Sequence, residues 1–389
     1  MEEHRSSLSP PGRVEFYDLS LRDGLEYPGI FLEREDKLKV VQALDELGVD
    51  RIEAGIPARS PQEAAFVKDA IEAGTEARIF ALCGIRSADI NLADKCGASS
   101  ILVEAPSSDE LITVGLKSTR EKTLNESIDV LKSAKNRGLF TSFFLMDATR
   151  ADLRFLLEMV EEAVNKGGAD EVILVDSTGS CYPEAMAFLT RKVRELGVTV
   201  GVHCHNDLGL ATANALSAVG AGAQVVHVSL NGMAGRSGFT SLDEIALCLK
   251  LFLGVESGIK FGKLYDASRL FAELTGVPIF PMKPVAGENA PLFEIGPAVM
   301  INDEFLKAGI STGFLAYAPS FVGRNFNVRL GTKSNIYSVE RMLNSLGMKA
   351  TQEDVTLILE RVIAVAKDKR ALLSEAEFQS IISGVLKQR

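Results

Sequence analysis

The chain has 389 residues, 46% of them hydrophobic, and 42 basic against 52 acidic side chains give it a formal net charge of −10. This length suits one large domain with a smaller one, and the acidic balance disfavours nucleic acid and anionic membranes as partners. The first residues lack the apolar core of a signal peptide, and no stretch is long and apolar enough to cross a bilayer. Five scattered cysteines, none in a CxxC pair, indicate reduced thiols in a cytoplasmic protein.

Short β-branched runs alternate with amphipathic segments over residues 14–256. Eight runs are predicted to be strands: Val14–Leu19, Arg51–Ile56, Arg78–Cys83, Ser100–Ala105, Phe140–Met146, Glu171–Asp176, Val198–His203 and Gln224–Leu230. Most of the segments between them end in glycine, which is typical of helix C-termini. Eight strand–helix units in about 240 residues predict a (β/α)8 TIM barrel, an α/β fold. An open doubly wound sheet is the alternative, but no GxGxxG follows the first strand.

The pattern changes after residue 256. Five prolines lie between 257 and 300, too many for a long regular element. Helices are predicted again over 336–346, 352–368 and 374–387. We therefore expect an N-terminal tail (1–13), a catalytic barrel (14–256) and a mostly helical C-terminal subdomain (257–389) that begins with an irregular linker (257–300). An independent binding module is the alternative for this last part.

Two histidines, His203 and His205, stand at i and i+2 at the end of the seventh predicted strand, so both side chains point the same way. Active sites of these barrels lie at the carboxyl ends of the strands. Asp23 follows the first strand and Asn231 the eighth, and strands one, seven and eight are neighbours in a closed barrel. The four side chains predict a site for Mg²⁺, Mn²⁺, Co²⁺ or Zn²⁺ with open positions for a substrate carbonyl and carboxylate. The alternative is a pair of histidines that binds no metal.

Other polar residues follow the predicted strands. Arg22, beside Asp23, is placed to stabilise a developing oxyanion and to bind substrate. We expect Arg86 and Arg150 to bind substrate and Asp147 to take part in catalysis. Candidates for orienting the metal ligands are Glu53, Asp207, Glu244 and His227. Each of these four also has a structural alternative, such as a helix cap for Asp207.

The chain resembles the DRE-TIM metallolyase superfamily in Leu21-Arg22-Asp23-Gly24, His203-Cys204-His205-Asn206-Asp207 and Asn231-Gly232. This group contains the 2-isopropylmalate, homocitrate and citramalate synthases, 3-hydroxy-3-methylglutaryl-CoA lyase and metal-dependent aldolases. The resemblance covers residues 14–389. Its similarity to the synthase branch extends to 52–55, 108–109, 147–150, 176–179, Pro319, 322–323 and 331–334.

The resemblance implies a Claisen-type condensation of acetyl-CoA, or another acyl-CoA, with a metal-bound 2-oxo acid, followed by thioester hydrolysis. Asp23, His203 and His205 would hold the metal, with Asn231 as the fourth ligand. Arg22 would stabilise the enolate or oxyanion, and Ser177 matches a hydroxyl near the substrate carboxylate. The family also implies a homodimer.

The chain departs from the synthases in its acid/base residues. Leu25 and Met146 stand where synthases usually carry carboxylates, and the segment Phe293–Ala298 lacks the two histidines of the synthase subdomain. The cysteine of the lyase glycine loop is also missing. The remaining candidates for proton transfer are Glu26, Tyr27, Glu294 and Tyr317, and of these we predict Glu26. A metal-dependent lyase or aldolase and a non-catalytic relative that binds metal and small acids remain as alternative functions.

Overall fold

The computed structural model describes residues 8–386. The chain forms two compact units that divide between Pro278 and Ile279. The first unit includes α10 (Leu264–Thr275), which packs against α2 (Arg34–Leu47). Residues 257–278, assigned to the linker on sequence grounds, therefore lie in the barrel unit because this helix joins its outer layer.

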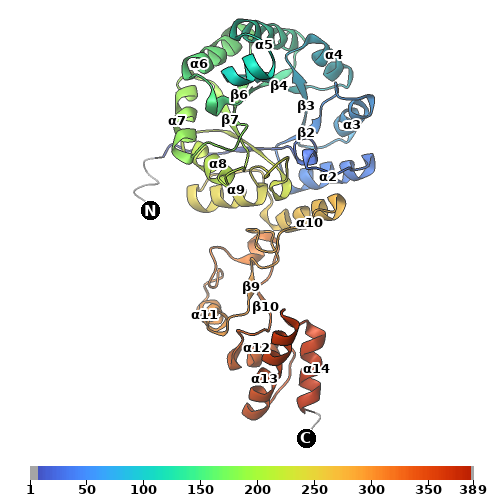
Figure 1. Ribbon diagram of the computed structural model, residues 1–389, viewed down its shortest axis with the longest axis vertical. Helices are drawn as coiled ribbons and strands as arrows, with labels where there is room; N and C mark the ends of the chain where they lie inside the picture. Colours follow the sequence, from blue (N-terminus) through green and yellow to red (C-terminus); the bar gives the residue numbers. More distant parts are fainter. Residues whose placement is uncertain (1–7, 387–389) are drawn as a thin grey trace. The chain divides into compact units, whose positions relative to one another are not determined.

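Eight parallel strands close into a barrel in chain order, with β1 paired to both β2 and β8, which confirms the predicted fold. The strands are β1 (Glu15–Asp18), β2 (Arg51–Gly55), β3 (Arg78–Gly84), β4 (Ser100–Pro106), β5 (Phe140–Met146), β6 (Glu171–Asp176), β7 (Thr199–Cys204) and β8 (Val225–Val228). The helices around it are α2, α3 (Pro61–Glu72), α4 (Ser87–Lys95), α5 (Arg120–Lys135), α6 (Leu153–Glu162), α7 (Pro183–Arg194), α8 (Ala211–Gly220) and α9 (Leu242–Cys248). Figure 1 looks into the ring of strands with these helices outside it.

Local sequence signals set the ends of these helices. α3 begins with Pro61 at its first position, and the Ser60 hydroxyl accepts a hydrogen bond from the Glu63 N–H at 3.1 Å. α2 ends at Gly48, whose φ of 90° is left-handed. A Cβ at Gly48 would lie 2.2 Å from the Gly258 carbonyl oxygen, so only glycine fits there.

The barrel interior is apolar at mid-height, where Tyr17, Leu19, Phe80, Leu82, Leu102, Phe144, Ile173, Val175 and Val225 pack together. At the amino-terminal end of the strands, buried Arg51 forms ion pairs with Glu171 at 2.5 Å and Glu15 at 2.6 Å. Its guanidinium also lies over the rings of Phe80 and Phe140. These contacts pack charged side chains against one another at this end, and active sites of such barrels lie at the opposite, carboxyl ends of the strands.

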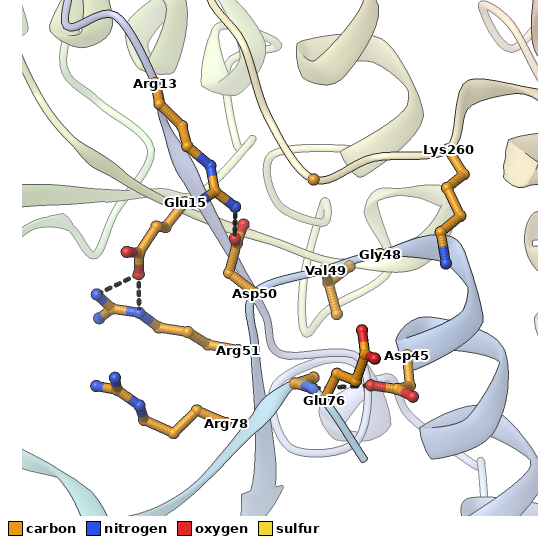
Figure 2. Close-up of a pocket in the computed structure, with 12 residues that line it drawn as sticks. Arg13, Glu15, Asp45, Gly48, Val49, Asp50, Arg51, Glu76, Arg78 and Lys260 are labelled. Atoms are coloured by element: carbon orange, nitrogen blue, oxygen red, sulfur yellow. Dashed lines mark hydrogen bonds and ion pairs between the residues drawn. The ribbon is translucent and has the colours of Figure 1, made fainter.

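An open cavity of about 340 Å³ lies beside Arg51 at the same amino-terminal end. Figure 2 shows two ion pairs among its charged side chains: Arg13 reaches Asp50, and Arg51 reaches Glu15. Ion pairs of this kind need no ligand to balance the charges of these four residues. The cavity therefore does not compete with the carboxyl ends of the strands as the candidate active site.

The second unit is mostly helical and has its own core. It contains a two-stranded parallel sheet, β9 (Leu292–Phe293) with β10 (Asn327–Val328), and four helices: α11 (Gly296–Lys307), α12 (Ile336–Ser345), α13 (Gln352–Lys369) and α14 (Glu375–Leu386). Apolar residues of the last three helices form the larger of its two described clusters. A capping box between Thr351 and Asp354 starts α13. Within residues 8–386, no helix is long and apolar enough to cross a membrane.

Candidate metal centre

Three side chains converge at the carboxyl end of the barrel: Asp23 after β1, His203 on β7 and His205 just beyond it. The two Nε2 atoms are 3.2 Å apart, and Asp23 Oδ2 lies 3.4 Å from His203 Nε2 and 3.9 Å from His205 Nε2. Bonds of about 2.1 Å to one ion place neighbouring donor atoms roughly 3–3.5 Å apart. Two of the three distances fall in this range and the third is slightly longer, so the three residues form a candidate site for one small cation.

The Nδ1 atoms of both histidines also have close polar neighbours. His205 Nδ1 lies 3.4 Å from the Gly238 carbonyl oxygen, which only accepts, so this nitrogen carries the proton. His203 Nδ1 lies 3.3 Å from His227 Nδ1. Contacts of this kind fix the ring orientations, and the contact to Gly238 leaves the Nε2 lone pair of His205 for a metal. His227 thus contacts one of the predicted ligands.

The protonation states suit metal binding. Burial raises the pKa of Asp23, but the Arg22 guanidinium and the two imidazoles outweigh it and bring this pKa well below its ordinary value. Burial lowers the pKa of His203 to about 3 and also lowers that of His205. At neutral pH the site therefore holds a carboxylate and two neutral imidazoles, the forms that bind cations.

Asn231 follows β8 in the left-handed conformation, with φ of 60°. Its Nδ2 donates a hydrogen bond to the Ser268 carbonyl oxygen at 2.9 Å, whereas its buried Oδ1 has no hydrogen-bond partner. Leaving such an acceptor unpaired costs about 1–3 kcal/mol. An amide oxygen fixed in this way fits a hard divalent cation as a further ligand.

Arg22 is held in the same region by two carboxylates. Its Nε donates to Glu53 Oε1 at 2.5 Å, and its Nη1 lies 3.3 Å from Asp23 Oδ2. Burial lowers the pKa of Arg22, but Glu53 and Asp23 raise it to a net value above the ordinary one. Nη2 is buried without a partner. Glu53 thus orients Arg22 and not one of the candidate metal-binding histidines, as the sequence had suggested it could. The Nη2 group of Arg22 remains free to donate.

Asp147, Arg150 and Ser177 form a second cluster. Asp147, with φ of 64°, accepts hydrogen bonds from Arg150 Nε at 2.8 Å and Nη2 at 2.7 Å, and from the Ser108 hydroxyl at 2.5 Å. The Ser177 hydroxyl accepts from the Asp147 N–H at 2.9 Å. These are the contacts of a residue that positions Arg150, and a catalytic role for Asp147 stays a prediction.

The other predicted site residues lie apart from the three-residue cluster. Arg86, whose side chain is 74% exposed, pairs with Asp89 on α4 at 3.2 Å. Glu26 is 44% exposed and pairs with Arg59 at 3.3 Å. Neither forms a hydrogen bond or ion pair with the cluster in the described part of the chain. Their predicted roles stay predictions.

Asp207 and Glu244 contact neighbouring elements instead of the histidines. Asp207 accepts two hydrogen bonds from Arg236, at 2.8 and 3.1 Å, and does not cap α8, which begins at Ala211. Glu244 accepts from the Thr212 hydroxyl at 3.2 Å. Glu294 and Tyr317 belong to the second unit, where Glu294 Oε1 accepts the Lys333 N–H at 3.0 Å.

Two residues of the barrel mouth were not singled out from the sequence. The Phe239 ring lies 4.3 Å from the His203 ring, between centroids, and shields it. Glu104 is a half-buried carboxylate on β4, a strand that is otherwise apolar at its centre. The sequence signal for Glu104 was an acidic residue within an otherwise apolar strand, two positions after the core residue Leu102.

Comparison with known proteins places these features in a family. The HMGL-like family matches residues 13–271. Homocitrate synthase AksA of Methanothermobacter thermautotrophicus is 34% identical over 381 residues, 98% of this chain and 96% of that protein. A 2-isopropylmalate synthase of Sulfurisphaera tokodaii is 38% identical over 364 residues, 92% of each chain. (R)-citramalate synthase CimA of Methanocaldococcus jannaschii is 34% identical over 373 residues, 96% of this chain and 74% of that protein.

Solved structures share the barrel. Hydroxymethylglutaryl-CoA lyase of Pseudomonas aeruginosa superimposes with a TM-score of 0.63 at 21% identity, over 69% of this chain and 95% of that one. The HMG-CoA lyase of Brucella melitensis gives 0.61 at 21% identity, over 68% and 100%. At this identity the structures show the fold alone. The family match and the nearly full-length relatives confirm the resemblance drawn from the motifs, and the chain belongs to the HMGL-like (DRE-TIM) family.

Proposed function

We propose that the protein catalyses a divalent-metal-dependent Claisen-type condensation of an acyl-CoA, acetyl-CoA in the first instance, with a 2-oxo acid. The observation that carries this proposal is the convergence of Asp23, His203 and His205 beside the buried guanidinium of Arg22. The synthase relatives, which match more than nine tenths of the chain, support the same reaction.

Asp23, His203 and His205 would hold the cation, with Asn231 Oδ1 completing the protein ligands. A cation bound there supplies a Lewis acid that polarises the carbonyl group of the 2-oxo acid. Arg22 is fixed by Glu53, and its Nη2 is free to donate to the negative charge that develops on oxygen. Because these groups are already positioned, little reorganisation is needed as the charge appears.

The second cluster supplies donors for the substrate carboxylate. Asp147 occupies two of the five N–H donors of Arg150 and leaves the others free. The Ser177 oxygen accepts from the Asp147 N–H, so its own O–H is available to donate. Arg86, exposed near the start of α4, is assigned to an outer part of the substrate, and Glu26 to proton transfer near the mouth.

The experiment is a thiol-release assay with acetyl-CoA and a broad panel of 2-oxo acids, run with Mg²⁺, Mn²⁺, Co²⁺ and Zn²⁺ in turn. We expect free CoA to appear only when one suitable 2-oxo acid and a divalent cation are both present. No free thiol with any combination contradicts the proposal.

A second candidate is a metal-dependent lyase or aldolase that cleaves a 2-hydroxy acid or a 4-hydroxy-2-oxo acid. It is favoured by Leu25, a partly buried apolar side chain beside Asp23, and by the absence of histidine in residues 293–298. Release of a 2-oxo acid from such a substrate without CoA would support it. Calorimetric binding of metal and small acids without turnover would instead indicate a non-catalytic relative.

A homodimer is part of the proposal. Within the second unit, large apolar side chains are exposed at Phe280, Met282, Ile295, Met300, Ile310 and Phe314. Exposed apolar groups gathered in one part of a chain commonly mark a protein contact. Light scattering coupled to size exclusion should give twice the chain mass of 41.9 kDa, and a single-chain mass at micromolar concentration contradicts the dimer.

A further inference from the structure

A carboxylate in the barrel mouth, Glu104, has no role in the account so far. Leu102 belongs to the apolar interior, and Glu104 is two residues further along β4, so it faces the same side. In strand register it lies beside Phe144 of β5. The Phe144 ring in turn contacts the His203 ring edge-on, 5.0 Å between centroids. A single residue, Phe144, therefore links Glu104 to the candidate metal ligand His203.

Glu104 differs from the other interior carboxylate near Arg22. Glu53 is fully buried and fixed by the Arg22 guanidinium. Glu104 is half-buried and has no hydrogen bond or ion pair with any residue in the described part of the chain. The charged side chains that act on it are Arg22, Asp23, Glu26, Glu53 and Arg59. A carboxylate that is oriented by its strand and has free lone pairs can accept a proton from a ligand.

The electrostatic surroundings favour proton acceptance. Burial raises the pKa of Glu104, Glu26 and Asp23 add to that rise, and Arg22 and Arg59 oppose it. A higher pKa makes the ionised form of the carboxylate a stronger base. Glu26, predicted from the sequence, is more exposed and already paired with Arg59. Glu104 therefore meets the requirements of a base better than Glu26.

We propose that Glu104 is the general base that removes a proton from the α-carbon of the acyl-CoA, an inference that rests on the proposed function. The proton moves to a Glu104 carboxylate oxygen, and the C–H electron pair forms the enolate of the thioester. The enolate carbon then bonds to the carbonyl carbon of the 2-oxo acid, whose C=O π pair moves to oxygen and takes up a proton. Water hydrolyses the thioester, and CoA leaves as the thiol.

The test compares wild type, Glu104→Gln and a matched control, Glu121→Gln, which makes the same change at an exposed position on α5. With the 2-oxo acid found for wild type, we expect kcat for thiol release to fall about 10²- to 10⁴-fold in Glu104→Gln. The bound-metal content and the KM for the 2-oxo acid should stay at the wild-type values. The Glu121→Gln control should keep the wild-type kcat, KM and bound-metal content.

Two further readouts separate a base from a structural group. Wild-type kcat should decline as the pH drops through the pKa of Glu104, because the base must be ionised, and this decline should be absent in Glu104→Gln. Formate should restore part of the activity of Glu104→Ala by supplying a small carboxylate in the vacated space. This second variant serves if Glu104→Gln does not fold.

Three results overturn the inference. If Glu104→Gln keeps the wild-type kcat, Glu104 is not the base; a changed preference among 2-oxo acids would then give it a role in specificity alone. If Glu104→Gln loses bound metal together with activity, Glu104 has a structural role. If wild type itself releases no thiol, the proposed function falls and this inference with it, whereas an active wild type with an active Glu104→Gln overturns this inference alone.

Discussion

The Nε2 atoms of His203 and His205 face each other at 3.2 Å, and each ring has its other nitrogen occupied. Burial keeps both imidazoles neutral, so this approach brings together two neutral rings instead of two positive charges. The Asp23 carboxylate closes the third side. The pair is best explained as a preformed half of a cation site.

Replacing Arg22 with lysine should lower activity while the fold is kept. Lysine keeps the positive charge between Glu53 and Asp23 but loses the planar fork that reaches both carboxylates and leaves Nη2 free. We expect kcat to fall about 10²- to 10³-fold, the usual effect of losing one oxyanion donor. Arg137→Lys, at a partly exposed ion pair with Asp94, is the matched control and should change kcat by no more than about twofold. Similar kcat values for the two variants would contradict the assignment.

The ion pairs at the closed end of the barrel should matter for stability and not for chemistry. Arg51→Met leaves Glu171 buried without its cation, which should lower the free energy of unfolding by about 3–5 kcal/mol. Arg13→Met, at an exposed pair, should cost less than about 1 kcal/mol. Denaturant unfolding gives both values. A larger loss for Arg13→Met than for Arg51→Met would refute this reading of the closed end.

Asp18 should make the protein less stable as the pH rises. It is fully buried, its Oδ2 has no partner, and burial raises its pKa to about 7. Between the pKa of the unfolded chain, about 3.9, and pH 7, the folded state holds the extra proton. The contribution of this group therefore favours folding below pH 4 and is lost progressively up to pH 7, by about 1.4 kcal/mol per pH unit.

Asp18→Asn tests that sign. The amide carries no charge, so the stability of the variant relative to wild type should increase steadily from pH 4 to pH 7. Urea unfolding at several pH values measures the difference directly. A difference that does not change with pH would show that Asp18 stays ionised throughout this range.

Much of the barrel and of the candidate metal site could be predicted because local sequence determines them. The β-branched runs and glycine-ended segments specify each strand–helix unit, and the spacing of His203 and His205 fixes their common direction. Asp23 could be added because chain order sets which strands are neighbours in a closed barrel.

Contacts between distant segments could not be predicted in the same way. Arg51 meets Glu171 only through the curvature of the whole barrel. Whether Glu104 or Glu26 is the free carboxylate depends on which of them Arg59 reaches. Residues 257–278 join the first unit because α10 packs on α2, a contact that no local pattern encodes.

The account depends on one cation held by Asp23, His203 and His205. Crystals of the Mn²⁺-loaded protein, measured for anomalous scattering, test it most directly. The account predicts one peak within about 2.0–2.3 Å of an Asp23 carboxylate oxygen and both Nε2 atoms, and its loss in His205→Ala. A peak elsewhere with none between these three side chains, or no peak in crystals of protein that releases thiol, would contradict it.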